Sequence, residues 1–335
     1  MSQVRESPVL VANDGGAGRP APGQAHRWLG LAAALGIGLV MSVQSRINGE
    51  LGRRLGDGIG AAVVSFGGGL VLLVVLVSAM PSGRRGIARV RDALRGGALR
   101  PWQCLGGVCG AFFVVSQGLA VATLGVALFT VAVVAGQAGS SLLVDRVGVG
   151  PAGPQPVTLP RVLGAGLAVA SVLVAVSGRL GEPSGWALAA LPALAGAAMA
   201  WQQAVNGRVR VAAGASLPPT LVNFLTGTVA LLVALAVDLA VRGFPGALPG
   251  DWWLYLGGPL GIVFIASAAA VVRLTGVLVL GLGSVAGQLV GAVLLDVFAP
   301  APGQAADTAT FVGTGLTLVA IVLAILPGRS SAGVS

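Results

Sequence analysis

Residues 28–48 read WLGLAAALGIGLVMSVQSRIN, and this stretch decides the class of fold. It contains no Asp or Glu, and it is as long as the roughly 20 apolar residues that a helix needs to cross the hydrocarbon core of a bilayer. Comparable apolar stretches recur along the whole chain. We predict ten membrane spans, at residues 28–48, 59–80, 103–122, 124–144, 161–178, 186–206, 218–241, 253–272, 276–296 and 309–327.

The composition agrees with a membrane protein. Of the 335 residues, 55% are hydrophobic and only 9% are charged, whereas about 25% of the residues of a soluble domain are charged. So few charges could hardly cover a surface exposed to water, and we therefore predict an all-α integral membrane protein. Residues 1–27 are rich in Gly, Pro and polar residues, and we expect a disordered cytoplasmic tail there, with a second short cytoplasmic tail at 328–335.

All basic side chains are arginines, and their distribution predicts the orientation in the membrane. If the amino terminus is cytoplasmic, fifteen of the 20 arginines fall in inner segments, and only Arg46, Arg53, Arg54, Arg179 and Arg242 fall in outer ones. Because inner segments are enriched in basic residues, we expect the chain in the plasma membrane with both termini in the cytoplasm. A net charge of +9 could indicate nucleic-acid binding, but the arginines lie between apolar runs, so we expect no nucleic acid as partner.

The residues needed for enzymatic or metal chemistry are scarce. The only histidine, His26, precedes the first span, and Cys104 and Cys109 have neither metal-binding nor redox spacing. We therefore expect no enzyme activity, no cofactor and no metal site. A membrane-embedded enzyme is the less favoured alternative, and a non-transporting scaffold or sensor would need a soluble partner domain or a long loop. The longest internal loop that we predict is the Arg-rich segment 81–101, which suits an orientation signal in contact with anionic lipid headgroups.

The chain contains an internal repeat. At an offset of 158 residues, Gln44, Asn48, Gly49, Phe66 and Gly69 correspond to Gln202, Asn206, Gly207, Phe224 and Gly227. At an offset of 151, the segments 105–107, 125–126 and 135–137 correspond to 256–258, 276–277 and 286–288, and Phe113, Ser116 and Asp145 correspond to Phe264, Ser267 and Asp296. We place the change of offset in the Arg-rich segment, because loops tolerate insertions and deletions.

Each half has five spans, which is an odd number, so the second half must cross the membrane upside down relative to the first. We predict two inverted five-helix repeats, at residues 28–178 and 186–327. Inverted repeats provide two near-equivalent packings, each of which opens a central site to one side, and this is the geometry of alternating access. The repeat therefore predicts a transporter of a small metabolite or drug-like solute, acting as a monomer or a homodimer.

Several short motifs carry a resemblance to a known family. In the first half they are Gln44-Ser-Arg-Ile-Asn48 with Leu51, Ser65-Phe66 with Gly69, Leu124-Gly125, Gly136-Gln137 and Leu143-Val144-Asp145-Arg-Val-Gly148; in the second they are Gln202-Gln-Ala-Val-Asn206, Asn223-Phe224 with Gly227, Gly287-Gln288 and Leu295-Asp296. In order, spacing and duplication these motifs resemble the YdcZ-like branch of the drug/metabolite transporter superfamily, over residues 28–327. The resemblance implies an inner-membrane transporter of ten helices built as two fused five-helix units. Asn223 stands where the first half has Ser65, and Ala299 where it has Gly148, so the halves are not strictly equivalent.

Polar side chains inside the spans are the candidate substrate ligands, because polar groups are costly in hydrocarbon unless they are satisfied. Gln137 and Gln288 are equivalent residues near the middle of their spans, where the substrate sites of inverted-repeat carriers lie. They are our first candidates, with interhelical hydrogen bonding as the alternative role. Ser65, Asn223 and Gln117 are secondary candidates with the same alternative.

Two further polar pairs suggest gates. Gln44 and Asn48 are four residues apart and share one helix face, and Gln202 and Asn206 repeat that spacing. The inverted repeat places the first pair toward the outside and the second toward the inside. We interpret them as polar gates at opposite mouths of the pathway or, alternatively, as groups that end their helices near the headgroups.

Acidic residues are absent from the central part of every predicted span, and Asp145 and Asp296 stand at span ends. Each aspartate either makes a helix-terminal or loop contact or couples transport to an ion. Since the exchange of protons for cationic drugs needs a buried carboxylate, we predict instead a neutral or zwitterionic solute, held by amides and backbone groups.

Topology mapping tests this interpretation. Single cysteines placed in residues 81–101 and in residues 242–252 are expected to react from opposite sides of the membrane, because the two segments connect equivalent helices of inverted halves. Labelling with a membrane-impermeant thiol reagent measures this. Labelling of both segments from the same side would contradict the inverted repeat, and the transporter inference with it.

Overall fold

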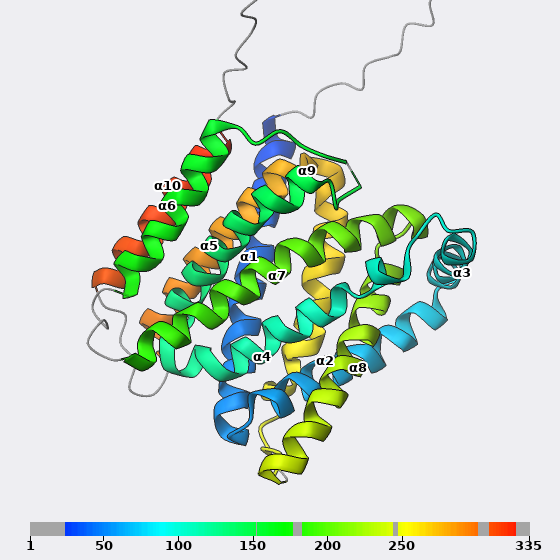
Figure 1. Cartoon of the computed structure of the whole chain (residues 1–335), viewed down its shortest axis with the longest axis horizontal. Coiled ribbons are helices and arrows are strands. Elements are labelled where there is room, and N and C mark those ends of the chain that lie inside the picture. Colours follow the sequence, from blue (N-terminus) through cyan, green and yellow to red (C-terminus); the bar gives the residue numbers. More distant parts are fainter. Residues whose placement is uncertain (1–23, 152, 177–182, 244–246, 301–307, 326–335) are drawn as a thin grey trace, which may run out of the picture.

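The computed structural model describes residues 24–151, 153–176, 183–243, 247–300 and 308–325 (Figure 1). Within these ranges the chain forms helices joined by turns and contains no strand, so the predicted all-α fold is confirmed. Residues 1–23 and 328–335, where we expect the tails, lie outside the described residues. Residues 24–27, which the composition assigns to the first tail, belong to the first helix.

The helices follow the predicted spans. The described part of the first half comprises α1 (Gln24–Leu55), α2 (Gly58–Ala79), α3 (Pro81–Arg95), η1 (Pro101–Cys104), α4 (Gly106–Leu124), α5 (Val126–Val147) and α6 (Leu159–Val176). That of the second comprises α7 (Pro183–Ala213), α8 (Leu217–Arg242), η3 (Trp252–Leu256), α9 (Gly257–Phe298) and α10 (Thr308–Ile325). Among the described residues, four helical segments are long and apolar enough to cross a bilayer by themselves: Gly58–Ala79, Pro101–Leu124, Val126–Val147 and Leu217–Val241.

Local sequence explains the helix boundaries at two of the turns. Asp57 caps α2, because its carboxylate accepts hydrogen bonds from the amides of Ile59 and Gly60 at 2.8 and 2.9 Å. The turn between the predicted spans 103–122 and 124–144 occurs at Gly125, whose φ of 81° is a conformation that favours glycine. The spans on either side of that turn are therefore separate helices, α4 and α5.

Element α9 comprises 42 helical residues in succession, where we predict two spans. Its contacts with α1 show that it reverses direction. A Cβ atom on Gly261 would lie 2.8 Å from the side-chain nitrogen of Gln44, and one on Gly291 would lie 3.0 Å from the hydroxyl of Ser42. In a straight helix Gly261 and Gly291 would be about 45 Å apart, yet Ser42 and Gln44 are neighbours on α1. Helix α9 therefore has two arms that run in opposite directions along α1, drawn in yellow and in orange in Figure 1.

The two halves interlock through equivalent contacts. Helix α1 of the first half packs along α9 of the second, and α7 of the second half packs along α4 and α5 of the first. The close approaches correspond as well: a Cβ atom on Gly287 would collide with the carbonyl oxygen of Leu35, and one on Gly136 would collide with that of Ala193. At the offsets of the repeat, Gly136 corresponds to Gly287 and Leu35 to Ala193. The predicted repeat is thus present in the packing of the helices.

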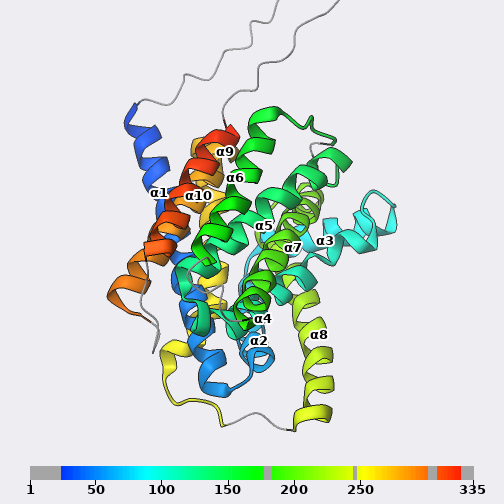
Figure 2. The ribbon, with the colours of Figure 1, turned by 60° about the vertical axis from the view of Figure 1, so that its left-hand side comes forward.

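The axis that relates the halves passes between α2 and α8. Phe66 of α2 and Phe224 of α8 are equivalent residues, and their rings stack with centroids 4.9 Å apart. Two equivalent residues that touch each other must lie at the pseudo-twofold axis. Consistent with the inversion, α3 and the yellow segment that contains η3 follow equivalent helices but lie at opposite ends of the bundle (Figure 2).

The bundle has two ends of different character. We call the end that holds α3, the last turn of α5 with Asp145, and Arg208 of α7 the basic end. The far end holds Leu55 of α1, the turn at Gly125 and the end of α9. Figure 1 shows that α1 begins and α10 finishes at the basic end.

The Arg-rich segment 81–101, which we predict to be a loop, forms α3 and η1 instead. Pro81 occupies the first helical turn, where proline is favourable, and Ala, Leu and Arg follow it. Gly83, Gly86 and Val90 are buried against the bundle. All five arginines of α3 are exposed, namely Arg84, Arg85, Arg89, Arg91 and Arg95, and Arg89 also reaches the carbonyl oxygen of Ala213 at the end of α7. The loop prediction was wrong because the few apolar residues follow helical spacing instead of forming a continuous run.

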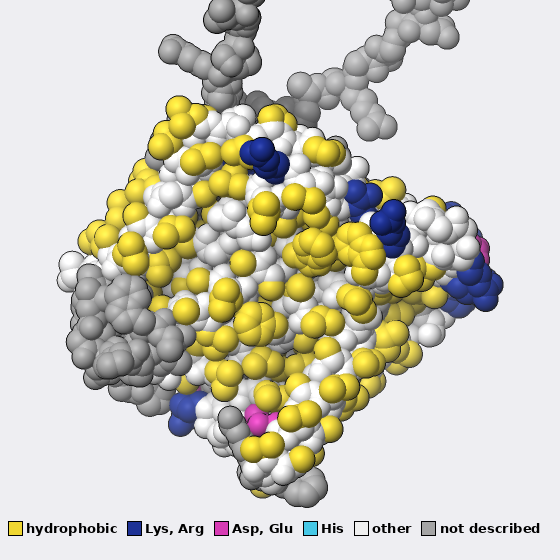
Figure 3. Space-filling view, in the orientation of Figure 1, with side chains coloured by type: hydrophobic (Ala, Val, Ile, Leu, Met, Phe, Trp, Pro, Cys, Tyr) yellow, Lys and Arg dark blue, Asp and Glu magenta, His cyan; other side chains and the backbone are white. Residues whose placement is uncertain are grey.

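The outer surface of the bundle is apolar, as a bilayer requires. Large hydrophobic side chains are exposed along α2 and α8, among them Val71, Val75, Leu232 and Val233. Figure 3 shows hydrophobic side chains spread over this face, with basic side chains at its edges, most densely at α3. Such a surface suits lipid on its sides and charged headgroups at its rim.

Gly69 should not tolerate a side chain. A Cβ atom there would collide with the ring of Phe224 at the axis, so Gly69→Ala is expected to lower the free energy of unfolding by about 1–3 kcal/mol, the usual effect of overpacking. At Gly68 a Cβ atom meets nothing within 4 Å, so Gly68→Ala is the matched control and is expected to be neutral or slightly stabilising. Thermal unfolding in detergent measures the difference, and equal midpoints for the two variants would contradict the axis contact.

Candidate functional site

A cluster of buried amides joins α1 to α4 and α9. Asn48 is fully buried and donates a hydrogen bond to the side-chain oxygen of Gln117 at 2.7 Å. Gln117 in turn donates to the hydroxyl of Ser45 at 2.8 Å. Gln44 is 6% exposed and donates from its side chain to the carbonyl oxygen of Gly257, at the start of α9, at 3.0 Å. The cluster therefore ties three helices together toward the far end.

Two buried amides of the second half are less completely paired: Gln202, which corresponds to Gln44, and Asn223, which corresponds to Ser65. Gln202 and Asn223 are buried, and both lie against Gly110 of α4, where a Cβ atom would be 2.7 Å from Gln202 Nε2 and 3.3 Å from Asn223 Oδ1. Within the described part of the chain, Gln202 Oε1 and Asn223 Nδ2 lack a hydrogen-bond partner, as does Asn48 Oδ1. Unpaired buried polar atoms are uncommon and costly, so these atoms mark places where a further partner would be favourable.

Both clusters lie well inside their helices. Helix α1 continues to Leu55 beyond Asn48, and α7 continues to Ala213 beyond Asn206. More than one helical turn follows each of them, so Asn48 and Asn206 are not the last residues of their helices. Ser65, a secondary candidate, is also buried, at 3% exposure.

The two central glutamines, our first candidates, contact different helices. Gln137 of α5 is half-buried and donates a hydrogen bond to the side-chain oxygen of Gln203 on α7 at 3.1 Å. Gln288 of α9 is also half-buried, and its backbone carbonyl oxygen accepts a hydrogen bond from the hydroxyl of Ser42 on α1 at 2.7 Å. No hydrogen bond of the described residues joins the two glutamines to each other. Gln203 is not among the predicted site residues, although its place beside Gln202 in a span is a signal that could have found it.

The two aspartates make different contacts. Asp296 is 8% exposed and accepts hydrogen bonds from the backbone amides of Val126 and Ala127 at 2.9 and 2.7 Å. These are the first amides of α5, so a carboxylate of the second half caps a helix of the first. Asp145 instead forms an ion pair with Arg161 of α6, within its own half, and its side chain is 38% exposed. Within the described ranges, no group of three or more His, Cys, Asp or Glu residues could hold a metal ion.

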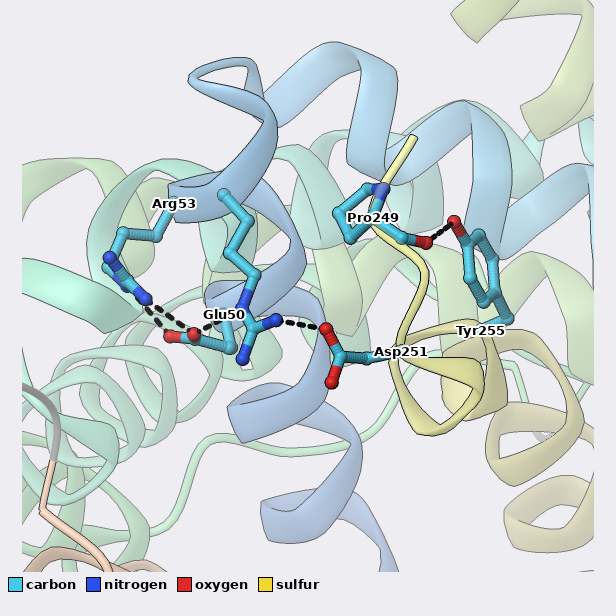
Figure 4. A network of polar contacts seen from close by, with 6 residues as sticks. Glu50, Arg53, Pro249, Asp251 and Tyr255 are labelled. Atoms are coloured by element: carbon cyan, nitrogen blue, oxygen red, sulfur yellow. Dashed lines mark hydrogen bonds and ion pairs between the residues drawn. The ribbon is translucent and has the colours of Figure 1, made fainter. Parts of the chain in front are cut away.

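A second polar network ties the halves together at the far end (Figure 4). Glu50 is 8% exposed and pairs with Arg53 and Arg54 of the same helix at 2.6 and 2.8 Å. Arg54 also pairs with Asp251, and its guanidinium lies 5.6 Å from the ring centroid of Trp253, within cation–π distance. Asp251 and Trp253 belong to the second half. Glu50 is absent from the predicted site because it lies just beyond the first predicted span.

Equivalent residues are buried to different extents at the two ends. Leu289 and Ala292 of the second arm of α9 are fully buried toward the far end. Their equivalents on α5, Ala138 and Ser141, are only half-buried toward the basic end. Along α5 itself, every residue of Val126–Ala135 is buried, whereas most of the remaining helix is half-exposed or exposed. The bundle is therefore packed tightly around α5 at the far end and loosely at the basic end.

A cavity lies between α1 and the first arm of α9. Its volume is about 310 Å³, and it is lined by Ala33, Gly36, Ile37, Val40, Val263, Phe264 and Ser267. Ser267 is the one polar side chain in this lining. The repeat places Leu191, Leu194 and Phe112 at the positions on α7 and α4 that correspond to Ala33, Gly36 and Val263. These three lining residues are smaller than their equivalents, whereas Ile37 and Val40 are larger than theirs, Ala195 and Ala198.

Inverted helical halves, an apolar outer surface and a cavity between helices are the features of a membrane transport protein, and comparison with known proteins gives the family. Residues 29–174 and 187–323 both match DMT_YdcZ, described as "Putative inner membrane exporter, YdcZ". The chain belongs to this family, as the motifs implied. A crystal structure with 20% identity and a TM-score of 0.50 is similar over 90% of this chain and 96% of its own, and this likeness shows the fold alone. No curated protein matches the chain.

Gln117 should be needed for stability. It is fully buried and bridges Asn48 and Ser45, so Gln117→Met would leave the side-chain amide of Asn48 without its acceptor. We expect a loss of about 1–2 kcal/mol in the free energy of unfolding, seen as a lower unfolding temperature in detergent. Gln137→Met removes one hydrogen bond at a half-buried position and is the matched control, with an expected loss of about 0.6 kcal/mol or less. A control destabilised as much as Gln117→Met would contradict the bridging role.

Proposed function

We propose that the chain carries a small solute across the plasma membrane by alternating access between its two inverted halves. The unequal burial of equivalent residues is the observation that carries this proposal: Leu289 and Ala292 are sealed at the far end, while Ala138 and Ser141 are half-exposed at the basic end. A static symmetric scaffold would bury equivalent positions alike. In a carrier, the other end state has this pattern exchanged between the halves.

The arginine distribution supports an orientation for this state. With both termini in the cytoplasm, the loosely packed basic end faces inward, and the far end, sealed by Asp296, Glu50 and their partners, faces outward. The structure then corresponds to an inward-facing state. Fused halves can complete one carrier in a single chain, so the proposal covers a monomer or a homodimer, without any catalytic step.

The cavity supports a class of solute. A volume of about 310 Å³ is at the lower end for small-molecule sites. Its lining offers one hydroxyl and no charged side chain, so an ion would lose its hydration there without compensation. We therefore propose a small neutral or zwitterionic solute with a largely apolar body. Ile37 and Val40 share their helix face with Gln44, so the cavity leads toward the buried amides, which would bind the polar part.

The amide clusters fit a gating role. Toward the far end, Asn48 is paired with Gln117, as in a closed gate. In the other cluster, Gln202 and Asn223 carry unpaired atoms that a solute, or closure of the basic end, would satisfy. The hydrogen bond between Gln137 and Gln203, at the loosely packed end of α5, would be an early point of contact for a solute.

Helix α3 supports contact with lipid. Its exposed arginines lie on one face of an amphipathic helix at the basic end, and such helices rest on membrane surfaces. Anionic headgroups are therefore the proposed partners of this face. The helix would fix the depth of the basic end in the inner leaflet.

Filling the cavity should stop transport without unfolding the protein. A Cβ atom on Gly36 meets nothing within 4 Å, so Gly36→Leu can be accommodated, and its side chain would occupy space that a solute needs. We expect uptake of a neutral solute by reconstituted vesicles to fall about tenfold or more, with a nearly unchanged unfolding temperature. Gly68→Leu, on an exposed face of α2 where a Cβ atom also meets nothing within 4 Å, is the control and should transport normally.

The solute itself is to be found with a panel of labelled amino acids, sugars and nucleosides, with and without a pH gradient. Proton-linked efflux of a permanent cation that survives replacement of both Asp145 and Asp296 would contradict the proposed class of solute. A folded protein that moves no member of the panel would favour the scaffold alternative.

A further inference from the structure

Both partners of the contact that Asp296 makes with the other half have equivalents elsewhere in the sequence. Asp296 caps α5 at Val126 and Ala127, directly after Gly125. At the offset of 151, Asp296 corresponds to Asp145, and Gly125-Val126 corresponds to Gly276-Val277 in α9. The chain therefore holds two carboxylates and two Gly-Val steps, of which Gly125-Val126 begins α5 and Gly276-Val277 lies within α9. In the structure Asp296 caps α5, whereas Asp145 is paired with Arg161.

The local geometry is built for a cap that comes from another helix. Gly125 has no side chain to cap α5, so the first amides of that helix need an acceptor from elsewhere. Its φ of 81° favours glycine, and a Cβ atom there would lie 2.8 Å from a carboxylate oxygen of Asp296. A buried carboxylate that accepts two amide hydrogen bonds at a helix amino terminus makes a strong contact. Replacing Gly125 or Asp296 would therefore weaken the attachment of α9 to α5 at the far end.

We propose that Asp296 and Asp145 are reciprocal latches. Asp296 holds the far end closed in the present state, and Asp145 leaves Arg161 and caps the segment at Gly276-Val277 when the basic end closes. This rests on the proposed alternating access, in which each residue takes over the environment of its equivalent when the carrier changes state. The two aspartates are thus positioning residues, and neither needs to touch the solute.

The two latches are not equal. Arg161, which holds Asp145 in the present state, has Thr310 as its equivalent in the second half, because α6 and α10 align at an offset of 149 that places Gly164 and Gly166 on Gly313 and Gly315. A released Asp296 would therefore lack an arginine in the corresponding place. This asymmetry favours the present state, because Asp145 pairs with Arg161 there, whereas the position equivalent to Arg161 carries no charge.

A pair of equivalent reporter positions tests the proposal. In a background in which Cys104 and Cys109 are replaced by Ala, Ser141→Cys reports on the basic end and Ala292→Cys on the far end. Asp296→Asn is expected to raise the thiol-labelling rate of the Ala292→Cys reporter relative to that of Ser141→Cys by about tenfold, the population shift that loss of a charge-assisted hydrogen bond produces. Asp145→Asn is expected to move the same ratio the other way, because the buried cap lost in the other state contributes more than the partly exposed ion pair with Arg161 lost in this one. Asp92→Asn, exposed on α3 beside Arg91, is the control and should leave the ratio unchanged.

A purely structural cap would not give opposite shifts. If both variants moved the labelling ratio in the same direction, or if both folded without moving it, the latch would be disproved. Should Asp296→Asn not fold, Asp145→Asn decides alone, since it must lower the ratio. Opposite shifts in a protein that moves no solute would support the latches and contradict the transport function, whereas solute uptake without any shift would contradict the latches alone.

Discussion

The structure depends on how closely its helices can approach one another. Helices in lipid gain little from the hydrophobic effect when they associate, so their packing depends on close contact and on a few hydrogen bonds. Glycines supply the contact: a Cβ atom on Gly136, Gly287 or Gly52 would collide with the backbone of the neighbouring helix. Wherever the glycines bring two helices together, buried amides can reach across, as Asn48 does to Gln117.

The contacts between the halves are of two kinds. Along the axis, and where α1 meets α9 or α7 meets α5, they are backbone-close, symmetric and made by small or aromatic groups. At the ends of the bundle they are polar and unsymmetric, as with Asp296 on α5 and Arg54 on Asp251. Close-packed contacts of the first kind resist separation, because every atom is already in contact. Polar contacts of the second kind can exchange partners, which makes the ends the natural place for movement.

The sequence predicts the fold further than it predicts the site, for physical reasons. Apolar length fixes the number of spans, and the repeat fixes their direction, so the reversal within α9 follows from the two spans predicted there. Apolar length does not predict helix α3, because its few apolar residues lie on one face and form no continuous apolar run. The pairing of Asp296 with α5 joins residues 170 positions apart, and the spacing within one half cannot indicate a partner in the other. Gln203 becomes a contact only when a second helix packs against it, whereas Glu50 pairs with arginines of its own helix and was missed because it lies just beyond the first predicted span.

A residue on a twofold axis faces its own copy. If a single five-helix chain paired with an upside-down copy of itself, one codon would specify both rings of the stack that Phe66 and Phe224 now form. Every substitution at that codon would change both rings, and the new side chain would have to pack against a copy of itself. Fusion into one gene lifts that restriction, and the adjoining positions, Ser65 and Asn223, already differ. The paired rings are thus identical on the two sides of the axis, while their neighbours Ser65 and Asn223 are free to differ because each has its own codon.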